Sequence, residues 1–149
     1  MKIAIATDHN GVNEKQELIK ILSEYEFLDK STNNTPIDDY PDFAYAVSKS
    51  VVNKEADLGV LLCGTGIGMS IAANKVKGIR CAHCSSVEQA HLAREHNDAN
   101  IIALSYKQDI NELVEMIKEF IETSHSEDER HHRRVNKIIS IEDGTYNEL

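Results

Sequence analysis

The chain has 149 residues, of which 41% are hydrophobic and 28% are charged, and its formal net charge is −9. These values are typical of one soluble globular domain spanning residues 1–149, and the negative charge disfavours nucleic acid as a partner. No apolar run approaches the roughly 20 residues of a membrane span, so we expect no membrane partner. Three cysteines without a disulfide spacing favour a reducing compartment, and we expect the cytoplasm.

The first part of the chain alternates apolar segments with stretches of helical periodicity. Residues 2–6 predict a strand, residues 13–25 a helix and residues 26–29 a short second strand. A polar loop then leads to a helix that begins near Pro41 and ends near Asn53. This alternation is typical of a parallel sheet with crossover helices.

The segment that follows organises the middle of the chain. Residues 58–62 are apolar, which predicts a strand buried on both faces. Cys63 comes next, and three glycines alternate through residues 64–68 before a helical stretch begins. Backbone N–H groups at such a turn can hold an anion or a developing oxyanion, and a thiol beside them can be acidified toward thiolate.

The second half continues the alternation of strands and helices. The pattern predicts a strand over 79–84, followed by a helix that is capped by Ser85 or Ser86 and ends near His96. A strand over 99–105 and a helix over 109–124 come next. The chain then forms a last amphipathic helix, whose apolar residues are Val135, Ile138, Ile139 and Ile141. The whole pattern predicts a three-layer, doubly wound, Rossmann-like α/β sandwich with a five-stranded parallel sheet. The last helix suits an oligomer contact or packing on its own domain, and both stay open.

Ligands of such folds bind beyond the carboxyl ends of the strands, where the strand order reverses. Asp8 and His9 follow the first strand and Cys63 follows the third, so these two clusters are expected to share one crevice. Met69 stands where a phosphatase loop needs arginine and where a dinucleotide loop needs glycine, which excludes both motifs. A buried cysteine is often only a small apolar residue. This position instead favours proton abstraction with an enolate-like intermediate.

Two groups of residues invite a metal or redox interpretation. Cys81 and Cys84 are three apart on a strand, so they point to opposite faces and core packing is favoured. His125, His131 and His132 match no recognised ligand spacing, and a solvated polar segment is favoured. We therefore expect no metal and no cofactor.

Histidine and arginine pairs supply two further hypotheses. His96 and Asn97 end a helix, where they could shuttle a proton and bind a carbonyl oxygen, or serve only as a favourable charge placement. Arg130 and Arg134 share one helical face, which suits phosphate, although generic surface arginines are common. The sequence leaves both choices open.

Taken together, these clusters resemble one family, the type B ribose-5-phosphate isomerases, within a wider group that includes allose-6-phosphate and galactose-6-phosphate isomerases. The resemblance spans nearly the whole chain in order. It rests on Asp8-His9-x-Gly11-x-x-x-Lys15, Asp39-Tyr40-Pro41, the run from Cys63 to Lys75, Gly78-Ile79-Arg80, His96-Asn97-Asp98-Ala99-Asn100 and Arg130-His131-x-x-Arg134-Val135.

The resemblance implies an aldose–ketose isomerase without a metal, which interconverts ribose 5-phosphate and ribulose 5-phosphate through a cis-enediolate. It implies that Cys63 moves the proton between C1 and C2 and that Thr65 and His96 open the sugar ring. The residues implied to bind substrate are Asp8, His9, Gly64, Gly66, Ile67, Gly68, Asn97, Lys107, Arg130, His131 and Arg134. It also implies a homodimer or homotetramer with active sites shared between subunits and the last helix at the interface.

Three positions depart from the family pattern. Lys107 stands where arginine is usual and replaces a planar fork with a point charge. Val12 replaces an aromatic residue and Ser31 replaces glycine, and both are expected to reshape the rim of the pocket. The alternatives are therefore an allose-6-phosphate or galactose-6-phosphate isomerase, or a non-catalytic phosphosugar-binding subunit on the same fold.

Overall fold

The computed structural model describes residues 1–148 and contains one five-stranded parallel sheet with the order β2-β1-β3-β5-β4. The strands are β1 (Lys2–Thr7), β2 (Glu26–Asp29), β3 (Leu58–Cys63), β4 (Cys81–His83) and β5 (Ile101–Ser105). The helices are α1 (Val12–Ile21), α2 (Tyr40–Val52), α3 (Ile67–Ala73), α4 (Val87–Asn97), α5 (Ile110–Glu122) and α6 (Glu129–Asp143). None of the helices among these residues combines the length and the apolar character needed to cross a bilayer.

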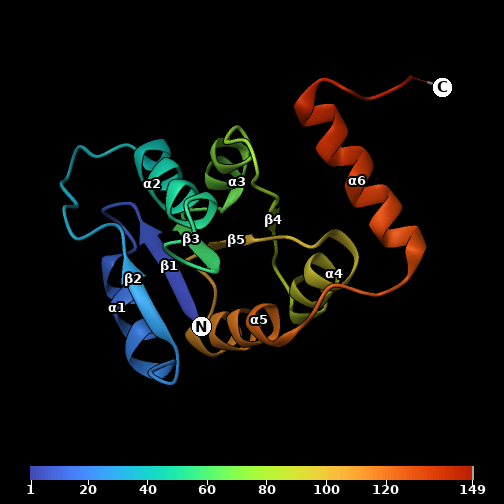
Figure 1. Cartoon of the computed structure of the whole chain (residues 1–149). Helices are drawn as coiled ribbons and strands as arrows, with labels where there is room; N and C mark the ends of the chain where they lie inside the picture. The colour runs from blue at the N-terminus through green and yellow to red at the C-terminus, as the bar shows by residue number, and fades with distance from the viewer. Residues whose placement is uncertain (149) are drawn as a thin grey trace.

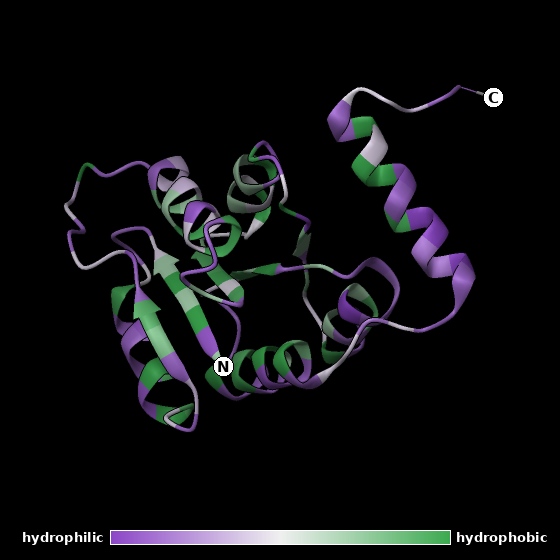
Figure 2. Ribbon diagram, viewed as in Figure 1, coloured by the Kyte–Doolittle hydropathy of each residue, from purple (hydrophilic) through white to green (hydrophobic). Residues whose placement is uncertain are grey.

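The sheet forms the middle layer of three. Helices α2 and α3 cover one face, while α1, α4 and α5 cover the other, as Figure 1 shows. All six residues of β3 are buried, because helices cover both of its faces. Figure 2 shows this as strands of hydrophobic colour between helices with one hydrophilic side. The predicted three-layer, doubly wound α/β fold is therefore confirmed.

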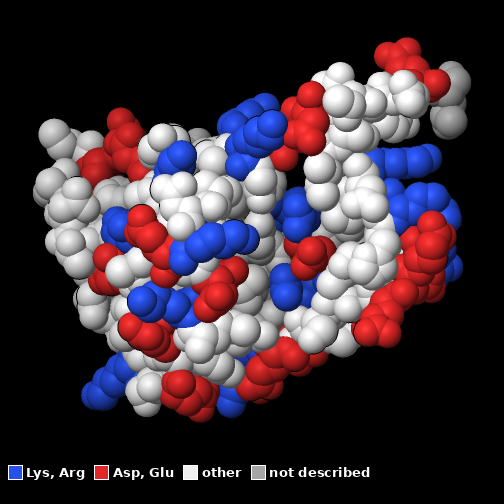
Figure 3. All heavy atoms as spheres, in the orientation of Figure 1, with Lys and Arg blue, Asp and Glu red and all other residues white. Residues whose placement is uncertain are grey.

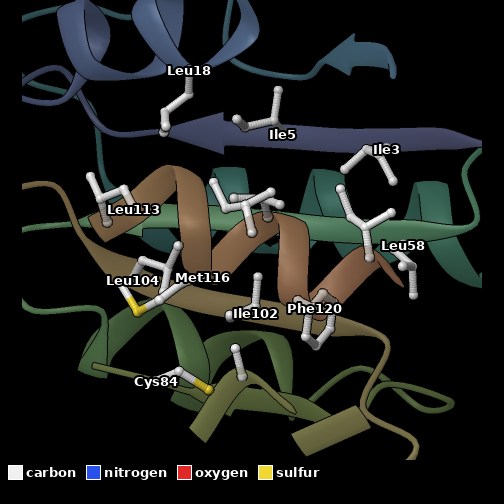
Figure 4. Packing of buried hydrophobic residues seen from close by; sticks show 14 of the residues in the cluster. Ile3, Ile5, Leu18, Leu58, Cys84, Ile102, Leu104, Leu113, Met116 and Phe120 are labelled. Atoms are coloured by element: carbon white, nitrogen blue, oxygen red, sulfur yellow. The ribbon is translucent and has the colours of Figure 1, made fainter. Parts of the chain in front are cut away.

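The larger apolar cluster lies between the sheet and α1, α4 and α5. In Figure 4, Leu113, Met116 and Phe120 project from α5 toward the strand residues Ile102 and Leu104. Their spacing of three and four residues places them on one side of the helix. The second cluster joins α2 and α3 to the opposite face and includes Cys63 at its edge. Both clusters fix the sheet on which the loops at its carboxyl edge stand.

Helix α6 differs from the other helices because it stands beside the three layers instead of covering the sheet (Figure 1). Its N-terminal turns contact the end of α4 through His131, which is buried, and Val135 is buried as well. Farther along, Ile138 and Ile141 are 43% and 61% exposed. An apolar groove of about 710 Å³ separates this part of α6 from β4 and from the turn that follows α3.

The boundaries of several elements differ from the sequence prediction. Helix α1 ends at Ile21 and not at residue 25, because Leu22 through Glu24 turn into β2. Strand β4 covers only Cys81–His83 and not 79–84, since it is an edge strand that pairs with β5 alone. Strand β5 begins at Ile101, two residues after the predicted start.

A buried lysine joins α1 to the strand ends that carry the site. Lys15 is 1% exposed, and its Nζ lies 2.9 Å from Asp29 Oδ2 and donates to the carbonyl and hydroxyl oxygens of Ser31 at 3.1 and 3.0 Å. The Ser31 hydroxyl in turn accepts a hydrogen bond from the backbone N–H of Thr7. Ser31 is fully buried, so its predicted place at the pocket rim is wrong. Its hydroxyl instead anchors the end of β1.

We expect Lys15→Met to lower the free energy of unfolding by about 3 kcal/mol, because removing one partner leaves Asp29 without its counter-charge. Urea denaturation measures the change. Lys20→Met, an exposed lysine on the same helix, is the control and should change the midpoint little. Equal midpoints for the two variants would contradict the importance of the buried pair.

Candidate active site

Cys63 ends β3 at the point where the strand order reverses. The chain runs from β1 out to β2 on one side and from β3 out to β4 on the other, and β5 then fills the place between β3 and β4, so the reversal lies between β1 and β3. Thr7 pairs with Leu62, which places Asp8 beside Cys63 at the carboxyl edge of the sheet. The Cys63 side chain is 6% exposed. The predicted neighbourhood of Asp8 and Cys63 is therefore present in the fold.

The loop after Cys63 turns a backbone N–H group toward the thiol. The N–H of Gly66 donates to Cys63 Sγ at 3.1 Å, and the N–H of Ile67 donates to the Thr65 hydroxyl at 3.1 Å. Gly66 has φ +83°, a conformation that L residues with side chains rarely adopt, and this turn lets α3 begin at once. The sulfur thus sits beside donors able to stabilise negative charge on an adjacent oxygen.

Two side chains from neighbouring strands hold this loop from outside. His83 Nε2 on β4 lies 2.8 Å from the carbonyl oxygen of Thr65, and its ring occupies the space that a side chain at Gly66 would need. The hydroxyl of Ser105 on β5 donates to the carbonyl of Gly64 at 2.8 Å. Lys107 follows directly on the same edge, with an exposed side chain.

The loop after β1 is fixed by a partly buried carboxylate. Asp38 Oδ1 accepts from the His9 backbone N–H at 3.1 Å and lies 2.7 Å from His9 Nδ1. Asn34 donates to Asp38 and to the Thr7 carbonyl. Burial raises the pKa of Asp38, but the hydrogen bonds from Asn34, His9 and Thr35 outweigh it and hold the pKa below its ordinary value. Asp38 therefore stays ionised and orients the His9 ring.

The remaining predicted site residues form a second cluster. His96 ends α4 and stacks on His131 of α6, with ring centroids 4.1 Å apart and an interplanar angle of 12°. Arg130 and Arg134 lie on the first turns of α6, and Figure 3 shows Lys and Arg side chains gathered along this helix. Asn97 is exposed beside His96.

Arg80 fixes the end of α4 on which this cluster depends. Its guanidinium donates to the carbonyl oxygens of Asn97 and Asp98 at 3.2 and 3.1 Å. Asp98 adopts φ 46°, a left-handed conformation that ends the helix. The short motif around Arg80 therefore has a structural role that the sequence did not indicate.

One chain does not bring the two clusters together. Gly59 pairs with Ile101, and Asn100 bonds to Gly59, so the end of α4 lies near the amino edge of the sheet. Cys63 lies four residues farther along β3, which is about 13 Å at ~3.3 Å per residue. His96 therefore lies far from the Cys63 loop of its own chain.

Cys81 and Cys84 lie apart from the Cys63 loop, in two different apolar clusters. Cys81 packs with the apolar cluster of α2 and α3, and Cys84 with that of α1, α4 and α5, so their side chains lie on opposite faces, as predicted. Burial raises the pKa of both thiols, that of Cys84 to about 11, and the charge of Cys84 adds to the effect on Cys81. Among residues 1–148, no group of three or more His, Cys, Asp or Glu side chains could hold a metal ion.

Sequence reasoning missed several residues that shape the site. Nothing in the local pattern connected Asp38 to His9 or His83 to the Cys63 loop, because these contacts join elements that are distant in the chain. Tyr106 was missed too, although it follows β5 at the predicted carboxyl edge. The one sequence feature that could have indicated a place in the site is that Tyr106 directly follows an apolar strand.

Fold and site thus define an α/β protein that presents a thiol and a turn rich in N–H donors at its topological switch point. Residues 3–138 match the family described as Ribose/Galactose Isomerase. Ribose-5-phosphate isomerase B of Escherichia coli is 42% identical over 143 residues, which cover 95% of this chain and 96% of that protein. The chain therefore belongs to this family.

Solved structures agree with this assignment. Ribose-5-phosphate isomerase B of Clostridium thermocellum superimposes with a TM-score of 0.91 at 41% identity, covering 97% of this chain and 99% of that one. The Mycoplasma genitalium enzyme, solved with bound ribulose 5-phosphate, gives a TM-score of 0.88 at 39% identity, covering 95% and 96%.

We expect phosphate binding to raise the pKa of His131. Burial, with the nearby charges of His96, Arg130 and Arg134, lowers this pKa, although Asp128 opposes the effect. A bound phosphate dianion would offset the positive charges and favour the imidazolium. Proton NMR titration with and without inorganic phosphate measures the shift, with His91 as the control. An unchanged His131 pKa at saturating phosphate would contradict an anion site here.

Proposed function

We propose that this chain is an aldose–ketose isomerase that interconverts ribose 5-phosphate and ribulose 5-phosphate. The observation that carries the proposal is the Cys63 thiol beside the N–H of Gly66 at the switch point of the sheet. Membership of the Ribose/Galactose Isomerase family supports it, as does the relative solved with ribulose 5-phosphate.

In the proposed reaction, Cys63 as thiolate removes the proton from C2 of the open-chain aldose. The electron pair forms the C1–C2 double bond, and the carbonyl oxygen on C1 gains negative charge. We assign the stabilisation of this enediolate to the N–H groups of Gly64, Gly66, Ile67 and Gly68. The O2 proton passes to O1, C2 becomes the carbonyl carbon, and Cys63 returns its proton to C1. No electrons leave the substrate, so the reaction needs no redox cofactor.

We assign the remaining residues by their match to the family pattern. Thr65 and His96 would open the sugar ring, and Asn97 would bind near the reacting carbons. Asp8 and His9 would bind sugar hydroxyls, an assignment supported by the ordering of His9 by Asp38. The residues assigned to the phosphate are Lys107, Arg130, His131 and Arg134.

These assignments require two chains at each active site. Cys63 and the His96 cluster lie at opposite edges of one sheet, so a second copy must supply the missing half. Exposed isoleucines support a contact between two copies of the chain. Ile67 and Ile71 on α3 are 50% and 58% exposed, and Ile138 and Ile141 of α6 line the apolar groove. We therefore propose a homodimer, alone or as half of a homotetramer, with α6 at the interface.

The proposed mechanism also bears on metal and location. A thiol and backbone donors supply the proton transfer and the charge stabilisation, so no metal is needed for the chemistry. Cys63, Cys81 and Cys84 are all free thiols, and an enzyme that uses a free thiol is suited to a reducing compartment. We propose that the protein works in the cytoplasm without a metal.

We expect the wild-type protein to form ribulose 5-phosphate from ribose 5-phosphate in excess EDTA, and Cys63→Ala to lose at least about a thousandfold in kcat with a similar substrate affinity. Cys81→Ala, at a half-buried cysteine on β4, is the control and should stay active. Turnover that persists in Cys63→Ala would contradict the thiol mechanism. If the protein turns over only allose 6-phosphate or galactose 6-phosphate, its substrate is a hexose phosphate. If it binds these sugar phosphates but turns over none of them, the chain is a non-catalytic subunit.

A further inference from the structure

Tyr106 is a large side chain beside the Cys63 loop that has no role in the proposed mechanism. It follows the last residue of β5, and its backbone N–H donates to the Cys63 carbonyl at 3.2 Å. Tyr106 therefore lies beside Cys63, whose thiol is proposed to react, at the carboxyl edge of the sheet. The side chain is half-buried.

The ring of Tyr106 lies between the two loops that form the proposed sugar site. A Cβ atom built on Gly11, in the loop after β1, would lie 2.7 Å from Tyr106 Cδ2. A Cβ atom on Gly64, in the loop after β3, would lie 3.6 Å from the Tyr106 hydroxyl. The ring thus packs on one loop while its hydroxyl reaches the other.

Two of the charged groups near Tyr106, Asp8 and Cys63, belong to the same site. Burial and the nearby charges of Asp8, Cys63 and Glu14 raise the pKa of Tyr106, while a hydrogen bond with the Asn10 side chain opposes them. The phenol is therefore neutral at neutral pH and keeps a proton to donate. When the Asn10 amide donates to the phenol oxygen, the phenol proton remains available for another acceptor.

We propose that Tyr106 contacts the substrate, donating a hydrogen bond to a sugar oxygen near the carbons on which Cys63 acts and limiting the site to five-carbon sugar phosphates. The inference rests on the proposed function and adds a residue that determines specificity. The hydroxyl is the donor, and the ring is the wall that a sixth carbon would meet.

The hydroxyl is tested by Tyr106→Phe, which keeps the ring against Gly11. The kcat/KM for ribose 5-phosphate should fall about tenfold, the loss expected for one neutral hydrogen bond to substrate. Tyr25→Phe is the matched control, because the Tyr25 hydroxyl donates to Glu122 at the other edge of the sheet. Equal kcat/KM values for wild type and Tyr106→Phe would overturn the donor role.

The ring is tested by Tyr106→Leu, which keeps an apolar group against the neighbouring cluster. The ratio of kcat/KM for allose 6-phosphate to that for ribose 5-phosphate should rise at least about tenfold. Because it is a ratio between two substrates, a general loss of folded protein leaves it unchanged. A ratio equal to that of wild type would overturn the role of the ring as a wall.

Binding separates this inference from the proposed function. Calorimetry measures ribose 5-phosphate binding to Cys63→Ala, with and without Tyr106→Phe added. If the wild-type protein binds the sugar phosphate without turning it over, the isomerase proposal is refuted but the proposed contact with Tyr106 is not. The contact predicts that the double variant binds ribose 5-phosphate more weakly than Cys63→Ala does. Equal affinity of the two proteins, or no binding by either, overturns the contact.

Discussion

A helix that joins two parallel strands must run back across the sheet, and this constraint determines where each functional residue can lie. Strand ends such as Cys63 stand at the carboxyl edge, whereas the end of α4, with His96 and Asn97, returns to the amino edge. The chain therefore carries a thiol site on one edge and a basic site on the other. Such an arrangement makes an incomplete active site in one chain and, we propose, a complete one between two.

Buried polar contacts give the carboxyl edge its fixed geometry. Lys15 ties the end of β1 to β2 through Ser31, and Asp38 holds His9. Apolar packing alone would fix the strands but leave the loops free, since a hydrophobic contact has no direction. Directional hydrogen bonds to buried charges restrict the loops to one arrangement. The site is thus ordered by groups that need not touch substrate.

Much of the fold could be predicted from the sequence because the parallel strands are buried on both faces. The apolar run before Cys63 and the alternation of strands and helices indicated the sheet and its layers, and Ser86 caps α4 as expected. Strand order, the early end of α1 and the shortness of β4 depend on tertiary packing, which no local pattern contains. The sequence also identified Cys63 and Asp8 as neighbours, yet it missed Asp38, His83 and Tyr106, whose roles arise from contacts between distant segments.

Subunit complementation tests the shared site most directly. Cys63→Ala and Arg134→Glu damage opposite halves, so each homodimer should be inactive, whereas a mixed dimer contains one site with both halves intact. Co-expressing the two variants should restore about a quarter of wild-type activity, because half of the dimers are mixed and each has one working site of two. Purified mixed dimers without activity, or a failure to form mixed dimers, would contradict an active site built from two chains.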